Sequence, residues 1–159
     1  MSNAPDPALM RRAIELALEG VRTASGGPFG ALVEREGRVI ATGFNRVLVE
    51  RDPTAHAEIV AIRGACAALQ SFELDGCTLY TSCEPCPMCL GAIYWARLDR
   101  VVYGCGRNDA ARAGFDDALL YEEFERAPSE RKIRFESFLC DEALAAMQAW
   151  IAKPDRTPY

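Results

Sequence analysis

Apolar side chains near the start of the chain recur three and four positions apart, which is the period of one face of an α-helix. This pattern predicts an amphipathic helix over residues 7–21, ended by a run of Ser and Gly. The next two stretches, 29–36 and 38–45, are short, largely apolar and flank Gly37. They predict the two strands of a β-hairpin.

Strand-like and helix-like stretches alternate over the rest of the chain. In order they are a helix over 55–70 with Thr54 as N-cap, a strand over 77–82, a buried helix over 85–98, a strand over 100–105, a helical turn over 109–114, an irregular stretch over 115–130, a strand over 132–139, a helix over 141–152 and a tail over 153–159. Such alternation is typical of a parallel sheet with helices on its faces. We expect a single α/β domain over residues 1–159 with a mixed, mostly parallel sheet of five strands between helices.

Charge and composition narrow the range of partners. The chain has 159 residues and a formal net charge of −5, and its acidic and basic residues are interspersed. A nucleic acid is not an expected partner, because phosphate binding depends on clustered Lys and Arg. There is no apolar stretch of about 20 residues to cross a bilayer, and the first residues do not form a signal peptide. We therefore expect a cytoplasmic protein with no membrane partner.

Three of the seven cysteines stand in the run TSCEPCPMC, residues 81–89. A disulfide clip, a redox pair and a metal site are three interpretations of this spacing. An odd number of cysteines without a signal peptide argues against the clip, because structural disulfides belong mainly to oxidising compartments. A redox pair would not explain the single histidine, His56, or the acid that follows it, Glu58.

A metal site explains these residues together. Ligands of open α/β sheets bind at the carboxyl ends of strands, where helices begin, and His56, Cys86 and Cys89 stand at predicted helix starts. One imidazole and two thiolates supply three ligands to Zn²⁺ and leave a fourth position to water, as in catalytic zinc sites. Glu58 can turn toward that position as a general acid and base.

The residues HAE at 56–58 and PCPMC at 85–89 match the H-x-E…P-C-x-x-C signature of zinc-dependent base deaminases. Stretches over nearly the entire chain also resemble the bacterial guanine deaminases of the cytidine-deaminase-like superfamily, namely GGPFGA, DPTAHAE, YTSCEPCPMCLGAIYWAR, AGFDDA and the final Tyr. The resemblance implies the three-layer cytidine-deaminase-like fold and hydrolysis of guanine to xanthine and ammonia with one zinc ion per subunit. It also makes Cys86 and Cys89 the thiolate ligands and Cys83 a packing residue, since a proline precedes the first ligand in that family.

The resemblance also implies which residues bind the base. The second acid of a GFDD run reaches the active site in guanine deaminases, which makes Asp117 a recognition carboxylate and a second proton carrier, although Asp116 could exchange roles with it. Guanine suits a carboxylate because its N1–H and its C2 amine are donors side by side. The other implied contacts are a hydrogen bond from Asn45, a stacking ring from Phe29, a pocket wall from Trp95, the backbone of Ala57, and Tyr159 at the end of a tail that closes over the site of its own or a partner subunit.

Each of these residues has a structural alternative. The two acids and Asn45 are common in turns, and the aromatic rings are commonly core residues. For the whole chain, a homodimer is the expected assembly, and exchange of the tail between subunits is a hypothesis. The rival activities are deamination of adenosine in tRNA, which shares both motifs, and deamination of guanosine, cytidine or cytosine. A zinc-stabilised scaffold without activity is the interpretation outside the enzymes.

Overall fold

The computed structural model describes residues 4–115 and 117–158, and it divides the chain into two compact units. The first unit ends at Asp117 and the second begins at Ala118. The prediction of one domain over the whole chain stays a prediction. Among the described helices, none is both long enough and apolar enough to cross a membrane.

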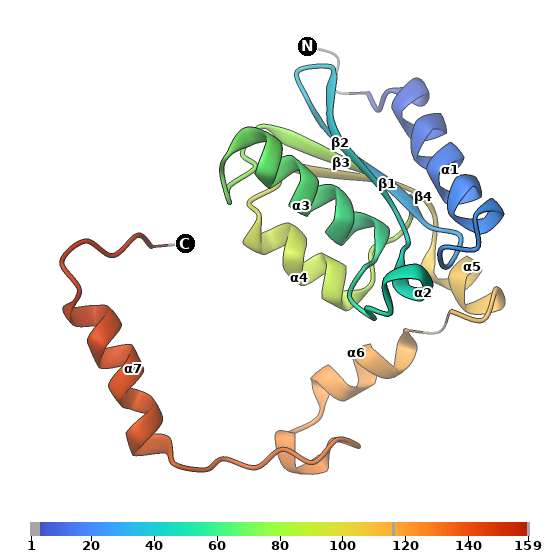
Figure 1. Ribbon diagram of the computed structural model, residues 1–159. Helices are drawn as coiled ribbons and strands as arrows, with labels where there is room; N and C mark the ends of the chain where they lie inside the picture. The colour runs from blue at the N-terminus through green and yellow to red at the C-terminus, as the bar shows by residue number, and fades with distance from the viewer. Residues whose placement is uncertain (1–3, 116, 159) are drawn as a thin grey trace. The chain divides into compact units, whose positions relative to one another are not determined.

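The first unit is built on a mixed sheet in the strand order β2-β1-β3-β4 (Figure 1). Its strands are β1 (Gly30–Arg35), β2 (Arg38–Phe44), β3 (Cys77–Cys83) and β4 (Arg100–Cys105). Strand β1 pairs antiparallel with both β2 and β3, and β4 pairs parallel with β3. The α/β class, the mixed sheet and the hairpin are therefore confirmed. The described residues form four strands rather than the expected five, and one of the three strand pairings is parallel. Too many parallel pairs were expected because each alternation of strand and helix was interpreted as a parallel crossover. Among the described strands, only β3 and β4 are joined in that way.

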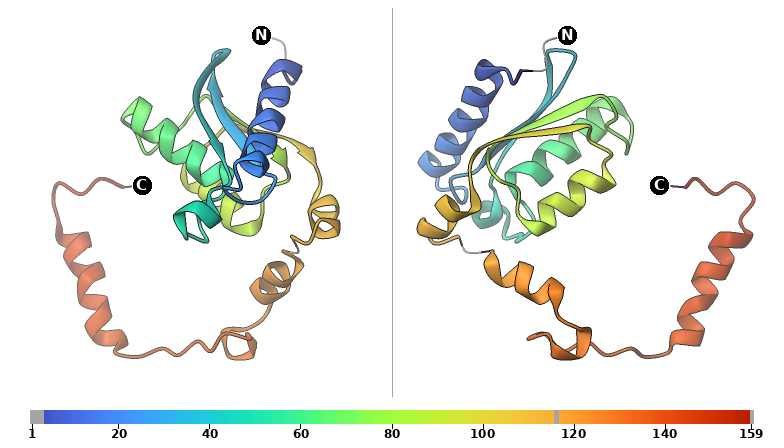
Figure 2. Two further views of the ribbon diagram at one scale, coloured as in Figure 1. Left: turned by 45° about the vertical axis from the view of Figure 1, so that its right-hand side comes forward. Right: turned by 180° about the vertical axis from the view of Figure 1, so that it is seen from behind.

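Helices cover both faces of this sheet, with α1 (Pro7–Arg22) on one face and α3 (Ala57–Leu69) and α4 (Pro87–Trp95) on the other (Figures 1 and 2). Successive side chains of a strand point to opposite faces, so the two cores alternate along β1 and β3. Buried Leu32 and Tyr80 pack with Ala13 of α1. The larger core, which includes Val33, Leu79, Ala61 and Ile93, lies on the other face.

Gly43 allows β2 to lie directly against the first turns of α3. A Cβ atom at this position would come within 2.5 Å of the Ala57 carbonyl oxygen and 2.8 Å of the Ala61 nitrogen. Real Cβ atoms essentially never approach other atoms so closely, so any larger residue would push the strand and the helix apart. The absence of a side chain at Gly43 thus fixes where the amino end of α3 lies.

Helix α3 begins two residues later than predicted. Its N-cap is His56 rather than Thr54, and no side chain caps the helix. The Thr54 hydroxyl instead donates to Asp52 Oδ1 at 2.7 Å, and the Thr54 N–H donates to the same oxygen at 2.8 Å. This turn around Asp52 competes with the helix for Thr54. The consequence is that His56 stands at the helix start with extended backbone.

Two short helices lie between the larger elements of the first unit. Helix α2 (Val47–Glu50) was not predicted, and α5 (Arg107–Arg112) corresponds to the helical turn expected over 109–114. Helix α4 is shorter than the expected 85–98 and only half buried, because Leu90, Tyr94 and Trp95 are exposed.

The second unit contains α6 (Ala118–Glu125), the 3₁₀-helix η1 (Pro128–Glu130) and α7 (Cys140–Ala152). Helix α7 agrees with the prediction for 141–152, while α6 and η1 lie in the stretch expected to be irregular. The predicted strand over 132–139 is wrong, since these residues form no strand. A strand needs a neighbour for its backbone hydrogen bonds, and the described part of the second unit has no other strand to offer one.

Candidate metal centre

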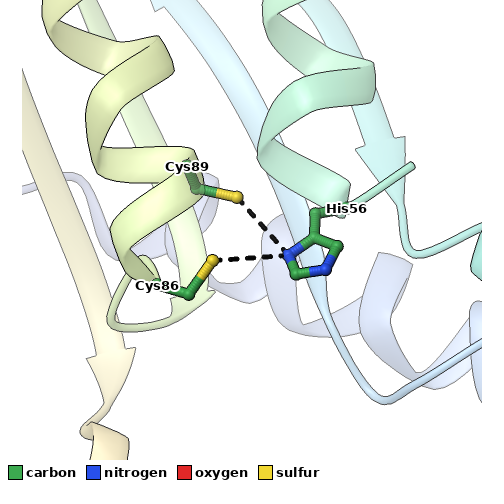
Figure 3. A group of neighbouring side chains, drawn as sticks. All are labelled: His56, Cys86 and Cys89. Atoms are coloured by element: carbon green, nitrogen blue, oxygen red, sulfur yellow. Dashed lines mark hydrogen bonds between the residues drawn. The ribbon is translucent and has the colours of Figure 1, made fainter. Parts of the chain in front are cut away.

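His56, Cys86 and Cys89 come together on the α3 and α4 side of the sheet. His56 Nδ1 lies 3.6 Å from Cys86 Sγ and 3.5 Å from Cys89 Sγ, and the three potential ligand atoms lie within 4.8 Å of one another (Figure 3). A Zn²⁺ ion with bonds of about 2.0–2.1 Å to nitrogen and 2.3 Å to sulfur separates such atoms by about 3.5 Å in a tetrahedron. The observed nitrogen–sulfur distances therefore fit a zinc ion.

Two helix starts position these ligands. His56 is the N-cap of α3, Cys86 is the N-cap of α4, and Cys89 stands one turn into α4 behind Pro87. The first N–H groups of a helix have no partner inside the helix, and they stabilise negative charge nearby. The thiolate form of cysteine, which binds metals, is favoured in such a place. The sequence predicted the three ligand residues and a helix beginning near each of them, although both helices begin two residues later than predicted.

The charges of the three side chains are coupled. The pKa of Cys86 is lowered to about 4, because hydrogen bonds with Cys89 and with His56 stabilise its thiolate. The pKa of Cys89 is raised by the same contact with Cys86 and by burial, and the pKa of His56 is raised by its hydrogen bond to Cys86. These pKa shifts arise because the three side chains lie close together, and a divalent cation bound between them would displace their protons.

Glu58 lies in the first turn of α3, two residues after His56, and only 5% of it is exposed. Its pKa is raised, chiefly because burial disfavours the charged carboxylate and further because of the charge on Cys86. Its carboxyl group also interacts with the thiol of Cys89. A buried carboxyl that contacts a metal-ligand cluster and holds a proton readily is suited to general acid and base chemistry.

Asn45 is buried next to the segment that leads into His56. Its Oδ1 accepts hydrogen bonds from the N–H groups of Gly27 and Val47, each at 3.2 Å. The two bonds assign the oxygen of the amide, so the NH₂ group faces the other way as a donor. Beside it, the Arg46 N–H donates to the Ala55 carbonyl at 2.9 Å, which joins this segment to the residue before His56.

Gly26 makes room for the Asn45 amide. A Cβ atom on Gly26 would lie 2.0 Å from Asn45 Oδ1. The sequence motif GGPFG therefore positions Asn45 in two ways. Its first glycine leaves space for the Asn45 side chain, and its Phe29 carbonyl accepts a hydrogen bond from the Asn45 N–H at 2.9 Å. The sequence predicted Phe29 and Asn45 as site residues but did not indicate that they are joined.

Phe115 is a neighbour of the site that the sequence did not predict. Its ring meets Phe29 edge to face, with 4.9 Å between the ring centres. This contact places Phe115, the residue before the two acids, beside Phe29. Asp117 is partly buried. The signal available in the sequence was the aromatic residue directly before the two acids. Asp116 and Tyr159 lie outside the described residues.

The remaining predicted residues are less closely tied to the cluster. Ala57 is buried and is the first residue of α3, so its N–H has no carbonyl partner within the helix. Trp95 ends α4, is 64% exposed, and has the Arg97 guanidinium 6.0 Å from its ring centre. Cys83 is buried and lies outside the group of three ligand atoms. Contacts of these residues with a substrate stay predictions.

Comparison with known proteins gives the class to which this fold and site belong. Residues 4–105 match the model of the cytidine and deoxycytidylate deaminase zinc-binding region. The chain therefore belongs to this family of zinc-dependent deaminases, and zinc is the metal that the three residues could hold.

Within this family, the chain is similar to guanine deaminases and, at lower identity, to tRNA-specific adenosine deaminases. The chain is 53% identical to guanine deaminase of Bacillus subtilis over 141 residues, which are 89% of this chain and 90% of that protein. It is similar to the X-ray structure of guanine deaminase from Bacillus subtilis with a TM-score of 0.95 and 49% identity, over 98% of this chain and 99% of that one. It is also 39% identical to tRNA-specific adenosine deaminase of Haemophilus influenzae over 126 residues, 76% of this chain and 72% of that protein.

Replacement of a ligand is expected to lower zinc affinity selectively. Cys86→Ser removes a thiolate, and its zinc affinity should fall by more than about 100-fold, since loss of outer hydrogen bonds alone costs about 10–100-fold. Competition with a chromophoric chelator measures the affinity. Cys83→Ser is the matched control and should keep the wild-type value; loss of zinc from this variant instead would make Cys83 a ligand.

Proposed function

We propose that this protein hydrolyses the C2 amino group of guanine and releases xanthine and ammonia, using one zinc ion per subunit. The observation that carries the proposal is the buried Glu58 carboxyl in contact with the cluster of His56, Cys86 and Cys89. The similarity to guanine deaminase over nearly the entire chain supports guanine as the substrate. With these two products, the reaction would be a step of purine breakdown.

Proton transfer is the task of Glu58. Zinc, when bound, supplies a Lewis acid that lowers the pKa of water at its open position. Glu58 accepts a proton from the attacking water as the oxygen bonds to C2 of guanine. It then donates a proton to the neighbouring ring nitrogen and passes a further proton to the departing amine, so that ammonia leaves and xanthine remains. Its raised pKa suits this exchange, because a strongly acidic carboxyl would not hold the proton between the two steps.

Recognition of guanine needs both donors and acceptors from the protein. The Asn45 NH₂ group, whose direction is set by the two bonds to its oxygen, can donate to an acceptor on the purine such as O6 or N7. Asp117 can accept from N1–H and the C2 amine. Adenine reverses this pattern, with an amine at position 6 and an acceptor at N1, so it would leave buried groups unpaired.

Two further groups hold the ring in place. Phe29 offers a stacking face, and its own orientation is supported by the edge-on contact with Phe115. The Ala57 N–H, which has no carbonyl partner within α3, can donate to the base. Trp95 would wall the pocket only if its exposed ring is covered in the assembled enzyme.

Activity on a panel of substrates tests the proposed reaction. Zinc-loaded protein should release ammonia and xanthine from guanine and leave adenine, cytosine, cytidine and guanosine unchanged, and a chelator should abolish the reaction. Glu58→Gln should keep its zinc and lose about 10²–10⁴-fold in kcat, the range for general acid and base groups. Ammonia assay, product spectrum and metal analysis provide the three readouts.

The control for Glu58→Gln is Glu73→Gln, a change at an exposed acid after α3, which should leave kcat unchanged. Full activity of Glu58→Gln would identify the site as a zinc-stabilised scaffold or place the proton carrier elsewhere. Turnover of adenosine in a tRNA anticodon loop with none on guanine would assign the chain to the tRNA deaminases.

Asp117→Asn tests recognition of the donor edge. The substitution keeps the size of the side chain but replaces one acceptor oxygen by a donor, which should cost about 1.5–3 kcal/mol, or roughly 10- to 150-fold in kcat/KM for guanine. Asp75→Asn, at an exposed turn before β3, is the control. A kcat/KM of Asp117→Asn within about twofold of wild type would contradict the proposed contact and leave the acid as a turn residue.

We also propose a homodimer in which the carboxyl-terminal segment of one subunit completes the site of the other. None of the described residues of the second unit is buried, although it carries Phe124, Ile133, Phe138 and Ile151, all of them mainly exposed. Apolar surface of this kind needs a partner to cover it. Tyr159 would meet the substrate at the end of this segment.

Mixing two inactive variants tests the exchange of the tail. Deletion of 153–159 should lower kcat/KM, and Glu58→Gln should lower kcat. If the tail acts in the partner's site, co-refolding the two proteins should restore activity, because each mixed dimer holds one site with both Glu58 and a tail. Mixtures no more active than their separate components would show that the tail acts within its own subunit, and wild-type activity of the deletion would remove the tail from the mechanism.

A further inference from the structure

Two cysteines outside the metal cluster meet where β3 and β4 end. Cys83 is the last residue of β3, Cys105 is the last residue of β4, and the two are paired directly across the parallel ladder. Paired residues of neighbouring strands point to the same face, and the strands lie about 4.8 Å apart. That separation lies within the range of about 4.4–6.8 Å between Cα atoms that a disulfide can join.

Each thiol points across to the other strand. The Cys83 thiol donates to the carbonyl oxygen of Gly106 at 3.8 Å, and the Cys105 thiol donates to that of Ser82 at 3.3 Å. These are weak bonds, so little holds the two sulfur atoms against a change of rotamer. Burial, and then the neighbouring Cys105 thiol, raise the pKa of Cys83 to about 12.

The two thiols differ in their access to solvent. Cys83 is 3% exposed, whereas Cys105 is exposed. A reagent in solution therefore reaches Cys105 first, and Cys83 stands behind it as the second thiol. This pairing of one accessible and one adjacent buried thiol is the arrangement of sensor cysteines with a resolving partner.

We propose that Cys83 and Cys105 form a dithiol oxidation site that a peroxide converts reversibly to a disulfide. The Cys105 sulfur attacks the peroxide, an S–O bond forms, the O–O bond breaks, and water leaves when the peroxide is hydrogen peroxide. The Cys83 sulfur then attacks the Cys105 sulfur, the S–S bond forms, and the S–O bond breaks. The departing hydroxide leaves as water with the Cys83 proton. The two thiols together lose two electrons, which the peroxide gains, and a thiol reductant reverses the change.

This site is separate from the metal ligands but is joined to them by the chain. Cys86 and Cys89 face His56, and neither is consumed by the reaction. The Glu84 N–H donates to the Cys105 carbonyl at 2.9 Å, so backbone pairing continues past Cys83 toward Cys86. The disulfide therefore fastens to β4 the turn that carries a zinc ligand.

Peptide mapping of the zinc-loaded, full-length protein tests the proposal. The protein is treated with hydrogen peroxide, its remaining thiols are alkylated, and a protease that cuts after Asp and Glu is added. Because Pro85 protects the bond after Glu84, this digest leaves Cys83, Cys86 and Cys89 together in peptide 76–99. Fragmentation of that peptide in the mass spectrometer at the Glu84–Pro85 bond then distinguishes Cys83 from Cys86 and Cys89. We expect one linked pair of peptides, 76–99 with 100–109, whose mass is lower by two hydrogen atoms than the sum of the two peptides and whose link passes through Cys83. Dithiothreitol should break the link, and the zinc content should be unchanged.

Variants assign the sulfur atoms of that linked pair. Cys83→Ser should abolish the link even though peptide 76–99 also contains Cys77, Cys86 and Cys89. It should leave Cys105 as a sulfenic acid that dimedone traps. Cys140→Ser, the matched control at the other exposed cysteine, should keep the link. The proposal is overturned if wild-type Cys105 gains oxygen while Cys83 remains open to alkylation, or if the link joins Cys86 or Cys89.

Discussion

The contact between His56 Nδ1 and the thiols of Cys86 and Cys89 is the interaction on which the site depends, and it joins residues about 30 positions apart. It exists because α3 and α4 begin beside one another on the same face of the sheet. Gly43 lets β2 approach the first turns of α3, and the parallel pair β3 and β4 requires α4 to cross over this face. The backbone thus sets the ligand positions before any metal binds.

The same geometry explains the electrostatic character of the site. Both helices begin without a capping side chain, so their first N–H groups are available to stabilise negative charge on thiolates and on bound groups. Glu58 stands in the first turn of α3 but is nearly fully buried, and loss of hydration outweighs the favourable position and raises its pKa. One helix start therefore carries a metal ligand and a carboxyl that keeps its proton.

Local chemistry made much of this site predictable. The ligand types and their spacing, the acid beside His56, the hairpin, and the helices over α1, α3, α4 and α7 all depend on residues close together in the sequence. The start of α3 was misplaced because a turn around Asp52 captures Thr54, a competition that spacing alone does not reveal. The strand predicted over 132–139 depended on a partner strand far along the chain, and the contact of Phe115 with Phe29 depends equally on tertiary packing.

The single histidine has a consequence for how the enzyme can be observed. Every imidazole signal in a magnetic resonance spectrum of the untagged protein comes from His56, and therefore from the centre of the metal site. The signals of this one imidazole, free of overlap with other histidines, would report whether the metal is bound and which ring nitrogen binds it. They would also report any change in the metal site when a base binds. The chain also has no second histidine that could replace His56. His56 is therefore the one imidazole ligand that each chain can offer to the metal.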